Sequence, residues 1–411
     1  MKNIVIVGAG TGGTLMANKL ARKLNLSEWN IIVIDPSEHH YYQPGFLFLP
    51  FQYYNEQQVV SKTKSFLPRK VQYLQTEAER LDGENKKIIL KSGEEISYDF
   101  CILATGTHPR PDQTPGLTGN LWRKNIFDFY TLEGALALQK FFSTWQGRKL
   151  VMAVAEVPIK CPIAPLEFVL LADDFFTRKG IRNKVEILYA TPQTGVFTKP
   201  VATAMLSNLL KERNILVETE FYIEKIDNEK KSIVSYDGRE ISFDCLTVVP
   251  VNMGSEFIAR SGIGDDMNYV PTNKYTLQSE KYPSVFVLGD AANLPASKAG
   301  SLIHFAAETL TANLLAVMKG GQPEMKFDGH VNCFLESGKK QATLIDFSYD
   351  TEPLPGQYPL PVIGPFQLLK LTRINHWGKL IFKWLYWNFI IRARPIPIPS
   401  RFSMKGKKLV K

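Results

Sequence analysis

Two cysteines stand in segments that could present a reactive thiol. Cys161 lies in "AEVPIKCPIAP", where prolines on both sides predict a rigid loop rather than a strand. Cys333, in "HVNCFLESGKK", is its only promising partner, because Cys101 and Cys245 lie inside apolar strands, where free cysteine is usually a small buried residue. Two thiols that can form a disulfide can exchange two electrons. The segments predict a redox pair, with a buried structural role open as the alternative, more so for Cys333.

A second group of residues, near the N-terminus, could bind a diphosphate. "NIVIVGAGTGGTLMANKL" reads as a buried strand, a glycine turn and a helix, and its glycines follow the spacing G-x-G-x-x-G at Gly8, Gly10 and Gly13. In that spacing the first glycine permits the turn, the second admits the pyrophosphate, and the third lets helix pack on strand. Asp35 ends the next strand, "NIIVID", and can accept hydrogen bonds from a ribose. A dinucleotide site is predicted; a glycine-rich turn in another α/β fold is the alternative.

Two later segments favour FAD over NAD as the dinucleotide. "YDFCILATGTHPRP" is an apolar strand that ends at Thr105 and Gly106, and "YPSVFVLGDAAN" is a strand that ends at Gly289 and Asp290. Together with the N-terminal turn they resemble the flavoproteins with two dinucleotide-binding domains. This resemblance implies that Asp290 binds the ribityl chain of FAD, and that the next helix directs its N-terminus at the flavin, where its dipole stabilises negative charge. An ordinary helix cap is the alternative for Asp290.

The elements that must position these groups include an internal repeat. "KKIILKSGEEISYDFCILATG" (86–106) parallels "KKSIVSYDGREISFDCLTVVP" (230–250), which a duplicated module explains most simply. We therefore predict an α/β fold with two Rossmann-like dinucleotide-binding domains, like that of glutathione reductase, and C-terminal amphipathic membrane-binding helices. The predicted divisions are an FAD-binding domain at 1–115 and 270–325, a second Rossmann-like domain at 116–269, and a C-terminal redox-cysteine and membrane or quinone region at 326–411.

The second Rossmann-like unit lacks the glycine turn of the first. Its first strand is followed by Ala-Val-Ala-Glu-Val-Pro at 153–158, and side chains at the first two glycine positions would crowd a pyrophosphate. We expect this unit to keep the shape of a nucleotide-binding domain without the nucleotide. The prediction disfavours an NAD(P)H oxidase, a disulfide reductase and a type II NADH dehydrogenase, and electrons must then come from another donor.

Composition and charge narrow the classes of protein to which the chain can belong. The chain has 411 residues, 45% of them hydrophobic and 22% charged, which is typical of a globular protein of two or three domains. Four scattered cysteines with no CxxC predict neither a disulfide scaffold nor a metal site. No signal peptide and no apolar run of about 18 residues are visible, so no membrane-spanning helix is expected. The formal charge of +9 gathers near the C-terminus, which we ascribe to anionic lipid rather than nucleic acid.

The cysteine segments carry a closer resemblance, which extends over essentially the whole chain. "PIKCPIAPLEFVLLADDFFTRKGIRNKVEILYATP", "KAGSLIHFAAETLTANL" and "NCFLESGKKQATLIDFSYDTEPLPG", with "HHYYQPGFLFLPF" near the N-terminus, are similar to sulfide:quinone oxidoreductases. The resemblance implies that Cys161 and Cys333 are redox cysteines flanking the flavin. Many members have a third cysteine before Cys161, but here Tyr130 stands near the expected place. The chain is therefore similar to the two-cysteine kind.

The resemblance implies an activity. Hydrogen sulfide would be oxidised to polysulfide or sulfane sulfur through the cysteine pair and FAD, and two electrons would pass to a membrane quinone. Glu167 is implied as a general base, Lys298 as a flavin-side cation and Pro44 as part of the flavin pocket wall; a helix-terminal carboxylate and a solvated lysine are the alternatives for the first two. Competing functions are a type II NADH:quinone oxidoreductase, the flavin subunit of a flavocytochrome sulfide dehydrogenase, and a non-catalytic sulfur-binding flavoprotein.

The C-terminal segment "HWGKLIFKWLYWNFIIRAR" interleaves aromatic residues with lysines and arginines, which suits a helix in the lipid interface; a core helix with snorkelling lysines is the alternative. The family resemblance implies that Phe382, and less strongly Tyr386, sandwich the quinone ring, and that Lys379 serves a quinone carbonyl. We expect a peripheral, monotopic homo-oligomer at the cytoplasmic face of the membrane, with sulfide and a quinone as its substrates.

Overall fold

The first parallel sheet is built around the N-terminal strand. The computed structural model describes residues 1–361, 364–396 and 398–409; Val362, Ile363, Pro397, Val410 and Lys411, within the predicted C-terminal region, lie outside them. The strand order is β21–β9–β1–β2–β5. The strands are β1 (Lys2–Val7), β2 (Trp29–Ile34), β5 (Gln72–Leu74), β9 (Phe100–Leu103) and β21 (Val285–Val287).

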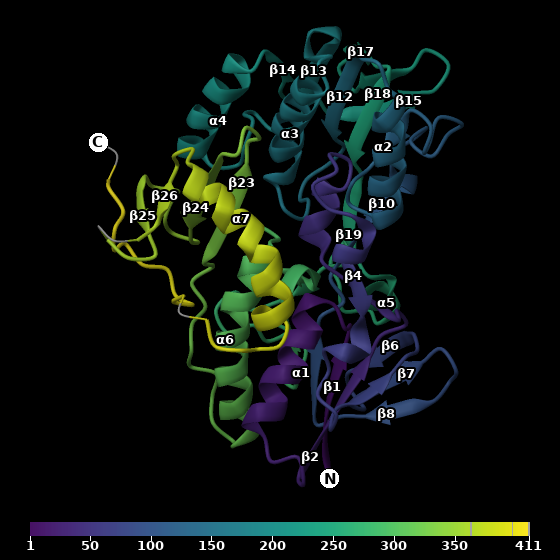
Figure 1. The fold of residues 1–411 in the computed structure, drawn as a ribbon. Helices are drawn as coiled ribbons and strands as arrows, with labels where there is room; N and C mark the ends of the chain where they lie inside the picture. The colour runs from purple at the N-terminus through teal and green to yellow at the C-terminus, as the bar shows by residue number, and fades with distance from the viewer. Residues whose placement is uncertain (362–363, 397, 410–411) are drawn as a thin grey trace.

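Both faces of this sheet are covered, which explains why β1 is apolar at successive positions. Ile4 and Ile6 pack with helices α1 (Thr11–Lys23) and α6 (Gly300–Met318), which lie side by side (Figure 1). Val5 and Val7 face the opposite side, where the sheet β6–β7–β8 and the short helix α5 (Glu256–Arg260) complete a second core. Strands buried on both faces are typical of parallel sheets in α/β folds.

A second parallel sheet repeats the plan. Its order is β11–β18–β12–β13–β14, and an antiparallel pair, β10 with β19, runs beside it. The sheet strands are β11 (Ile126–Phe127), β12 (Arg148–Val154), β13 (Val185–Ala190), β14 (Ile215–Glu218) and β18 (Cys245–Val249); the pair is β10 (Thr107–Arg110) and β19 (Val251–Gly254). The helices of this part are α2 (Leu132–Thr144), α3 (Ala164–Arg178) and α4 (Pro200–Glu212).

The predicted internal repeat is confirmed. Each copy is a three-stranded antiparallel sheet, and both copies have a register shift at the corresponding place in their first strand. The copies are β6 (Ala78–Asp82), β7 (Lys87–Leu90) and β8 (Glu95–Ser97), and β15 (Ile223–Asp227), β16 (Ser232–Ser235) and β17 (Glu240–Ser242). Matching turn glycines, Gly93 and Gly238, adopt φ of 87° and 83°. The domain boundaries drawn from this repeat stay a prediction.

The C-terminal region differs from the expectation of amphipathic helices alone. It begins with a four-stranded sheet of order β23–β24–β26–β25, made of β23 (Val331–Glu336), β24 (Ala342–Phe347), β25 (Gly356–Tyr358) and β26 (Phe366–Leu368). One α-helix follows, α7 (Arg373–Leu385), and continues into a π-helix, Tyr386–Ile390. Helix α7 packs against β23, β24 and β26.

Short elements elsewhere are β3 (His39–Tyr41), β4 (Val60–Lys62), β20 (Val270–Pro271) and β22 (Ala292–Asn293), with 3-10 helices at Gln43–Phe48, Glu56–Gln58, Thr63–Ser65, Pro111–Gln113, Arg182–Lys184 and Gly289–Ala291.

Helix α6 is long and apolar enough to cross a membrane, by length and composition only, so the expectation that no helix spans a membrane stays a prediction. Within its apolar window 56% of the residues are buried in the protein. It packs against α1 and β23, as a core helix does. A different element, α7, presents apolar side chains outward. These side chains lie on one face of the helix, and each is at least half exposed. They are Ile374, Trp377, Ile381 and Trp384.

Candidate active site

One cavity of about 860 Å³ collects most of the residues singled out in the sequence. Its lining includes the turn before α1, the segment after β9, the start of α6 and part of α7. The predicted residues in the lining are Gly8, Gly10, Asp35, Pro44, Thr105, Gly106, Cys161, Glu167, Gly289, Asp290, Lys298, Lys379, Phe382 and Tyr386. Gly13 and Cys333 are not part of the lining.

The three glycines of the first turn meet three different physical demands. Gly8 adopts φ of +99°, and a Cβ there would lie 2.4 Å from the Ala104 carbonyl oxygen. A Cβ on Gly13 would lie 1.7 Å from the Gly8 carbonyl oxygen, so this glycine serves helix packing, as predicted, and not the cavity surface. A Cβ on Gly10 would meet nothing within 4 Å. The open space beside Gly10, at the N-terminus of α1, fits a diphosphate.

Two buried polar atoms in the cavity wall support the fit of FAD. Asp290 Oδ1 and Thr105 Oγ1 have no hydrogen-bond partner among the described residues. Buried polar atoms are rarely left unpaired, and the hydroxyls of a ribityl chain and ribose would satisfy them. Asp35 is already engaged: its carboxylate accepts hydrogen bonds from the Ala9 N–H at 2.6 Å and the Ser37 N–H at 2.8 Å. Its second lone pairs stay open to a ribose, because each carboxylate oxygen can accept two hydrogen bonds.

Lys298 contacts the backbone of the segment that carries Asp290. Its Nζ donates to the Asp290 carbonyl at 2.8 Å and to the Ala292 carbonyl at 3.1 Å, and lies 3.7 Å from the centre of the Tyr269 ring. The side chain is buried, so the alternative of a solvated lysine is wrong. Desolvation lowers the pKa of Lys298 to about 8. One Nζ proton is left for a ligand, since an ammonium group donates three.

Cys161 occupies a constrained loop, as the flanking prolines predict. It adopts φ of 51°, an uncommon conformation for a residue with a Cβ. Its N–H donates to the Lys298 carbonyl at 2.6 Å, which ties the cysteine loop to the loop before α6. Its carbonyl accepts from the Ala164 N–H at 2.9 Å, at the start of α3, and from the Tyr130 hydroxyl at 3.3 Å. Tyr130 thus helps to hold Cys161 in place.

Cys333 reaches the same region from another part of the chain. It lies on β23 opposite Ile345, and both it and Cys161 are half-buried free thiols, whereas Cys101 and Cys245 are fully buried in strands. Desolvation raises the pKa of Cys333, and negative charge on Cys161 raises it further. Desolvation raises the pKa of Cys161 to about 11, opposed by the charge of Lys379.

A buried ion pair lies beside the two cysteines. Glu167 lies on the first turn of α3 and is 1% exposed; its role as a general base stays a prediction. The Lys379 Nζ lies 2.8 Å from Glu167 Oε1 and also donates to the Phe334 carbonyl at 2.9 Å, one residue after Cys333. Burial raises the pKa of Glu167, and Lys379 opposes the rise. Lys379 therefore connects α7, α3 and β23 at the cavity wall.

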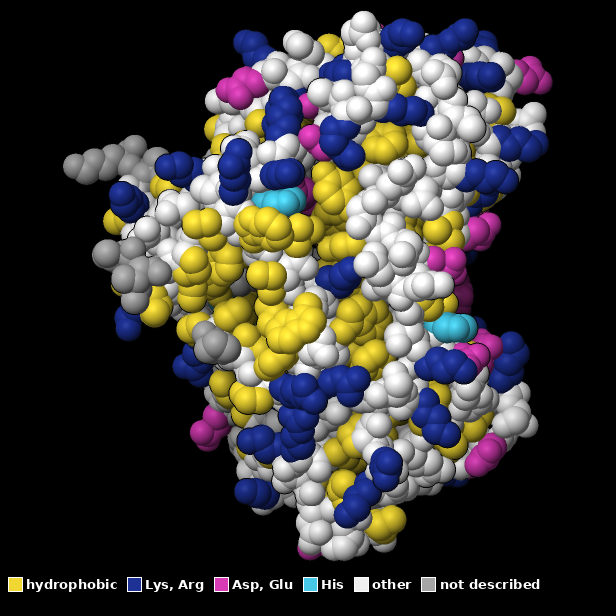
Figure 2. All heavy atoms as spheres, in the orientation of Figure 1, with side chains coloured by type: hydrophobic (Ala, Val, Ile, Leu, Met, Phe, Trp, Pro, Cys, Tyr) yellow, Lys and Arg dark blue, Asp and Glu magenta, His cyan; other side chains and the backbone are white. Residues whose placement is uncertain are grey.

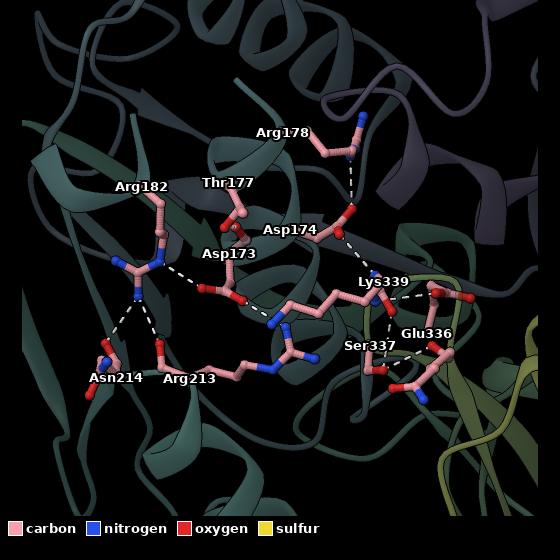
Figure 3. A network of polar contacts seen from close by, with 12 residues as sticks. Asp173, Asp174, Thr177, Arg178, Arg182, Arg213, Asn214, Glu336, Ser337 and Lys339 are labelled. Carbon is pink, nitrogen blue, oxygen red and sulfur yellow. Dashed lines mark hydrogen bonds and ion pairs between the residues drawn. The ribbon is translucent and has the colours of Figure 1, made fainter. Parts of the chain in front are cut away.

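A second polar network fixes α3 against the β23–β24 hairpin (Figure 3). Asp174 Oδ1 accepts from the Lys339 N–H at 2.8 Å, and its Oδ2 accepts from Arg178 at 2.9 Å. Asp173 pairs with Arg182 and Arg213 at 2.6 and 2.8 Å. Because α3 begins just after Cys161 and β23 contains Cys333, this network helps to fix the relative positions of the two thiols.

The predicted quinone residues all line the cavity, and their role stays a prediction. Phe382 lines the cavity, 6.5 Å from the ring of the fully buried Tyr42. Tyr386 also packs near Tyr42, but its hydroxyl lies 2.7 Å from His40 Nε2 and 2.8 Å from Thr11 Oγ1. Thr11 is the first residue of α1, so the Tyr386 hydroxyl lies on the dinucleotide side of the cavity.

Several residues at the site were not predicted from the sequence. Lys160 lines the cavity next to Cys161 and donates to Gln43 at 3.1 Å. His40 and Tyr42 lie in the N-terminal segment "HHYYQPGFLFLPF", but its sequence predicted no role for either residue. Glu336 and His376 form a hydrogen-bonded pair next to Glu167. For Lys160 the available signal was a cation next to the cysteine predicted to be redox-active; nothing in the local sequence marks the other residues.

Comparison with known proteins agrees with this geometry. The family model described as pyridine nucleotide-disulphide oxidoreductase matches residues 2–150. The mitochondrial sulfide:quinone oxidoreductases of Mus musculus and Dictyostelium discoideum are each 27% identical over 399 residues, which cover 95% of this chain and 86% of each relative. The chain is a homologue of sulfide:quinone oxidoreductases. The X-ray structure of the sulfide:quinone oxidoreductase from Aquifex aeolicus has the same fold, with a TM-score of 0.77 at 20% identity, covering 96% of this chain and 92% of that one.

The present protein is an FAD-binding oxidoreductase, as predicted. Its second Rossmann-like sheet departs from nucleotide-binding units at the turn after β12. Ala155 and Glu156 follow the strand there, in place of a glycine turn. Glu156 is exposed and places a negative charge where a diphosphate would approach. FAD, when bound in the main cavity, supplies a two-electron carrier close to Cys161.

Proposed function

We propose that the protein oxidises sulfide to polysulfide or sulfane sulfur through Cys161, Cys333 and FAD, and passes two electrons to a membrane quinone. The single observation that carries this proposal is the meeting of three features at one cavity: a dinucleotide turn, the Cys161 thiol, and a buried lysine–carboxylate pair whose lysine also bonds to the residue after Cys333. The sequence relationship to sulfide:quinone oxidoreductases over 95% of the chain supports the same reaction.

The cysteines would do the sulfur chemistry. Hydrosulfide attacks one sulfur of a Cys161–Cys333 disulfide; a new S–S bond forms, the old one breaks, and a persulfide and a thiolate result. We assign sulfur acceptance to Cys333, which lies outside the cavity lining, and electron transfer toward the cofactor to Cys161, which lies in it. Because burial raises the pKa of both thiols, the nearby Lys379 would stabilise the thiolate, and Glu167 would accept protons.

The α7 side of the cavity would serve the quinone. Phe382 and Tyr42 supply aromatic surfaces, and the Lys379 Nζ is a hydrogen-bond donor for a carbonyl oxygen. Tyr386 can contact the ring with its face, while its hydroxyl stays bound to His40 and Thr11. The cofactor roles of Gly8, Gly10, Asp35, Asp290 and Lys298 belong to the same proposal.

Anaerobic mixing of the holoprotein with sulfide, and separately with NADH, tests the function. Sulfide alone should bleach the flavin absorbance rapidly, and a soluble quinone added afterwards should restore it. Bleaching by NADH and not by sulfide would support a type II NADH:quinone oxidoreductase instead. Bleaching by sulfide with no return on adding quinone, but return on adding a cytochrome, would support the flavin subunit of a flavocytochrome sulfide dehydrogenase.

We further propose that α7 lies in the lipid interface of a membrane, at its cytoplasmic face. The outward face of α7 carries four exposed apolar residues, Ile374, Trp377, Ile381 and Trp384. Of these, Trp377 and Trp384 are 61% and 55% exposed. Figure 2 shows hydrophobic side chains gathered over α7 and its surroundings, with lysines and arginines along the border. Tryptophan beside cations is typical of helices that bind at the interface. The quinone side of the cavity would then face the source of its substrate.

Replacing both Trp377 and Trp384 by alanine should release the protein from vesicles. Burial of each side chain contributes on the order of 2 kcal/mol, so each loss should weaken binding by roughly tenfold or more. Co-sedimentation with anionic lipid vesicles measures the change. Tyr236→Ala, which removes a 75% exposed aromatic residue remote in sequence from α7, is the matched control and should bind like wild type. Equal binding by the double variant would contradict the assignment of α7.

A further inference from the structure

A buried acid–histidine pair adjoins the Glu167–Lys379 pair but has no part in the sulfur chemistry. Glu336 Oε2 lies 2.7 Å from His376 Nδ1. The Glu336 side chain is fully buried, and that of His376 is 7% exposed. Glu336 ends β23, three residues after Cys333, and His376 lies on α7, three residues before Lys379. The pair therefore connects β23 to α7, as Lys379 also does, but one helical turn nearer the N-terminus of α7.

The pair has one end beside the site and the other beneath an exposed tryptophan. On the inner side, the Glu336 backbone N–H donates to Glu167 Oε1 at 2.8 Å, and the charges of Glu167 and Lys379 both act on the Glu336 carboxyl. The carboxyl itself has no hydrogen bond to either member of that pair among the described residues, so a proton has to cross to the pair through an intervening water molecule. On the outer side, the ring of His376 packs edge-on against Trp377, which is 61% exposed. Burying such groups is costly unless they are paired, so their retention beside a redox site calls for a reason.

Quinone reduction supplies that reason. A quinone that accepts two electrons must also accept two protons, and the proposed site for its carbonyl, Lys379, is 12% exposed. We propose that His376 and Glu336 form a proton relay between solvent and the Glu167–Lys379 pair. This rests on the proposed function. In each passage His376 takes up a proton from solvent and gives one to Glu336. Glu336 reprotonates the Glu167–Lys379 pair after the latter has given a proton to a quinone oxygen.

The electrostatics of Glu336 suit a proton donor near neutral pH. The groups that face it are Glu167 and Asp174 from α3, Lys379 and His376 from α7, and Tyr53 and Tyr54 from the segment after the first 3-10 helix. Desolvation first, and then Glu167, raises the pKa of Glu336 to about 8. Desolvation lowers the pKa of His376. The carboxyl thus holds a proton below pH 8 and loses it above, so a relay through it should slow as pH rises.

Two variants separate relay from packing. Glu336→Gln keeps the size and the hydrogen bond but cannot release a carboxyl proton. His376→Ala leaves a gap that free imidazole can fill from the surface. The readout is the rate at which a short-chain ubiquinone reoxidises flavin that has been reduced with dithionite, so that the cysteines take no part. We expect Glu336→Gln to reoxidise roughly tenfold or more slowly, and to lose the decline in rate across about pH 8. His376→Ala should be slow, and added imidazole should accelerate it severalfold.

His330→Ala is the matched control. His330 Nε2 lies 2.7 Å from Asp346 Oδ1 in an equally buried pair that lines no part of the cavity, so imidazole should leave this variant unchanged. Reoxidation of Glu336→Gln within twofold of wild type at every pH would overturn the relay, as would a slow His376→Ala enzyme that imidazole does not accelerate. Failure of quinone to reoxidise the wild-type protein would instead remove the proposed function itself.

Discussion

Replacing Cys161 by alanine should abolish the bleaching of the flavin by sulfide while FAD stays bound. The thiol lies in the cavity lining and is the one we assign to electron transfer, so its loss should slow sulfide-driven reduction by at least about 10³-fold. The Cys161 loop is held by backbone hydrogen bonds to Lys298 and Ala164, which alanine retains. Stopped-flow absorbance after anaerobic mixing with sulfide measures the rate, and reduction by dithionite should match wild type.

Cys101→Ala is the matched control, because it also removes a free thiol, but one that is buried in β9. It should be reduced by sulfide as fast as wild type. Cys333→Ala should lose turnover as Cys161→Ala does, because neither thiol alone can form the disulfide that sulfide attacks. Bleaching of Cys161→Ala at the wild-type rate would mean that sulfide reduces the flavin without this cysteine.

The parts of the site that sequence predicts are those set by local backbone chemistry. The glycine turn is one: the spacing alone assigns Gly8 to the turn, Gly10 to the open space and Gly13 to helix packing, and the structure has each in that place. The rigid loop at Cys161 is another, since prolines restrict the backbone wherever they occur. The internal repeat is a third, because two copies of one pattern fold alike.

The parts that sequence does not predict depend on contacts between distant segments. Glu336, in "LESGKK", has the neighbours of a surface hairpin residue, yet α7 and α3 bury it completely. The Tyr386 hydroxyl bonds to His40, 346 residues earlier in the chain, a contact that no local pattern indicates. The C-terminal sheet that presents Cys333 was not predicted either. Burial of a polar side chain is a property of tertiary packing, and no periodicity in its own segment records it.

Replacing Lys379 by methionine should both destabilise the protein and slow the return of electrons to quinone. Methionine nearly fills the space of the lysine stem but leaves the Glu167 carboxylate buried without its cation. Breaking a buried ion pair on one side costs on the order of 3–5 kcal/mol of unfolding free energy. Loss of the proposed hydrogen bond to the quinone should slow flavin reoxidation by roughly 10²-fold. Denaturant unfolding and stopped-flow reoxidation measure the two effects separately.

The double variant Glu167→Gln, Lys379→Met separates charge from packing, because it removes both members of the pair. It should recover much of the lost stability but none of the reoxidation rate, since a neutral pair leaves no buried charge uncompensated. Equal stability of the single and double variants would mean that the ion pair does not govern packing at this site.

The pH dependence of the single variant gives an independent check on the same carboxyl. Burial already raises the pKa of Glu167, and only the charge and hydrogen bond of Lys379 and one backbone N–H oppose the rise. Without Lys379 the pKa of the folded state should rise further, while that of the unfolded state stays near its ordinary value. Between those two values the folded protein binds more protons than the unfolded one, so stability falls as pH rises. Lys379→Met should therefore lose less unfolding free energy in mildly acidic buffer than in alkaline buffer. The double variant, which has no carboxyl at position 167, should show the same deficit at both.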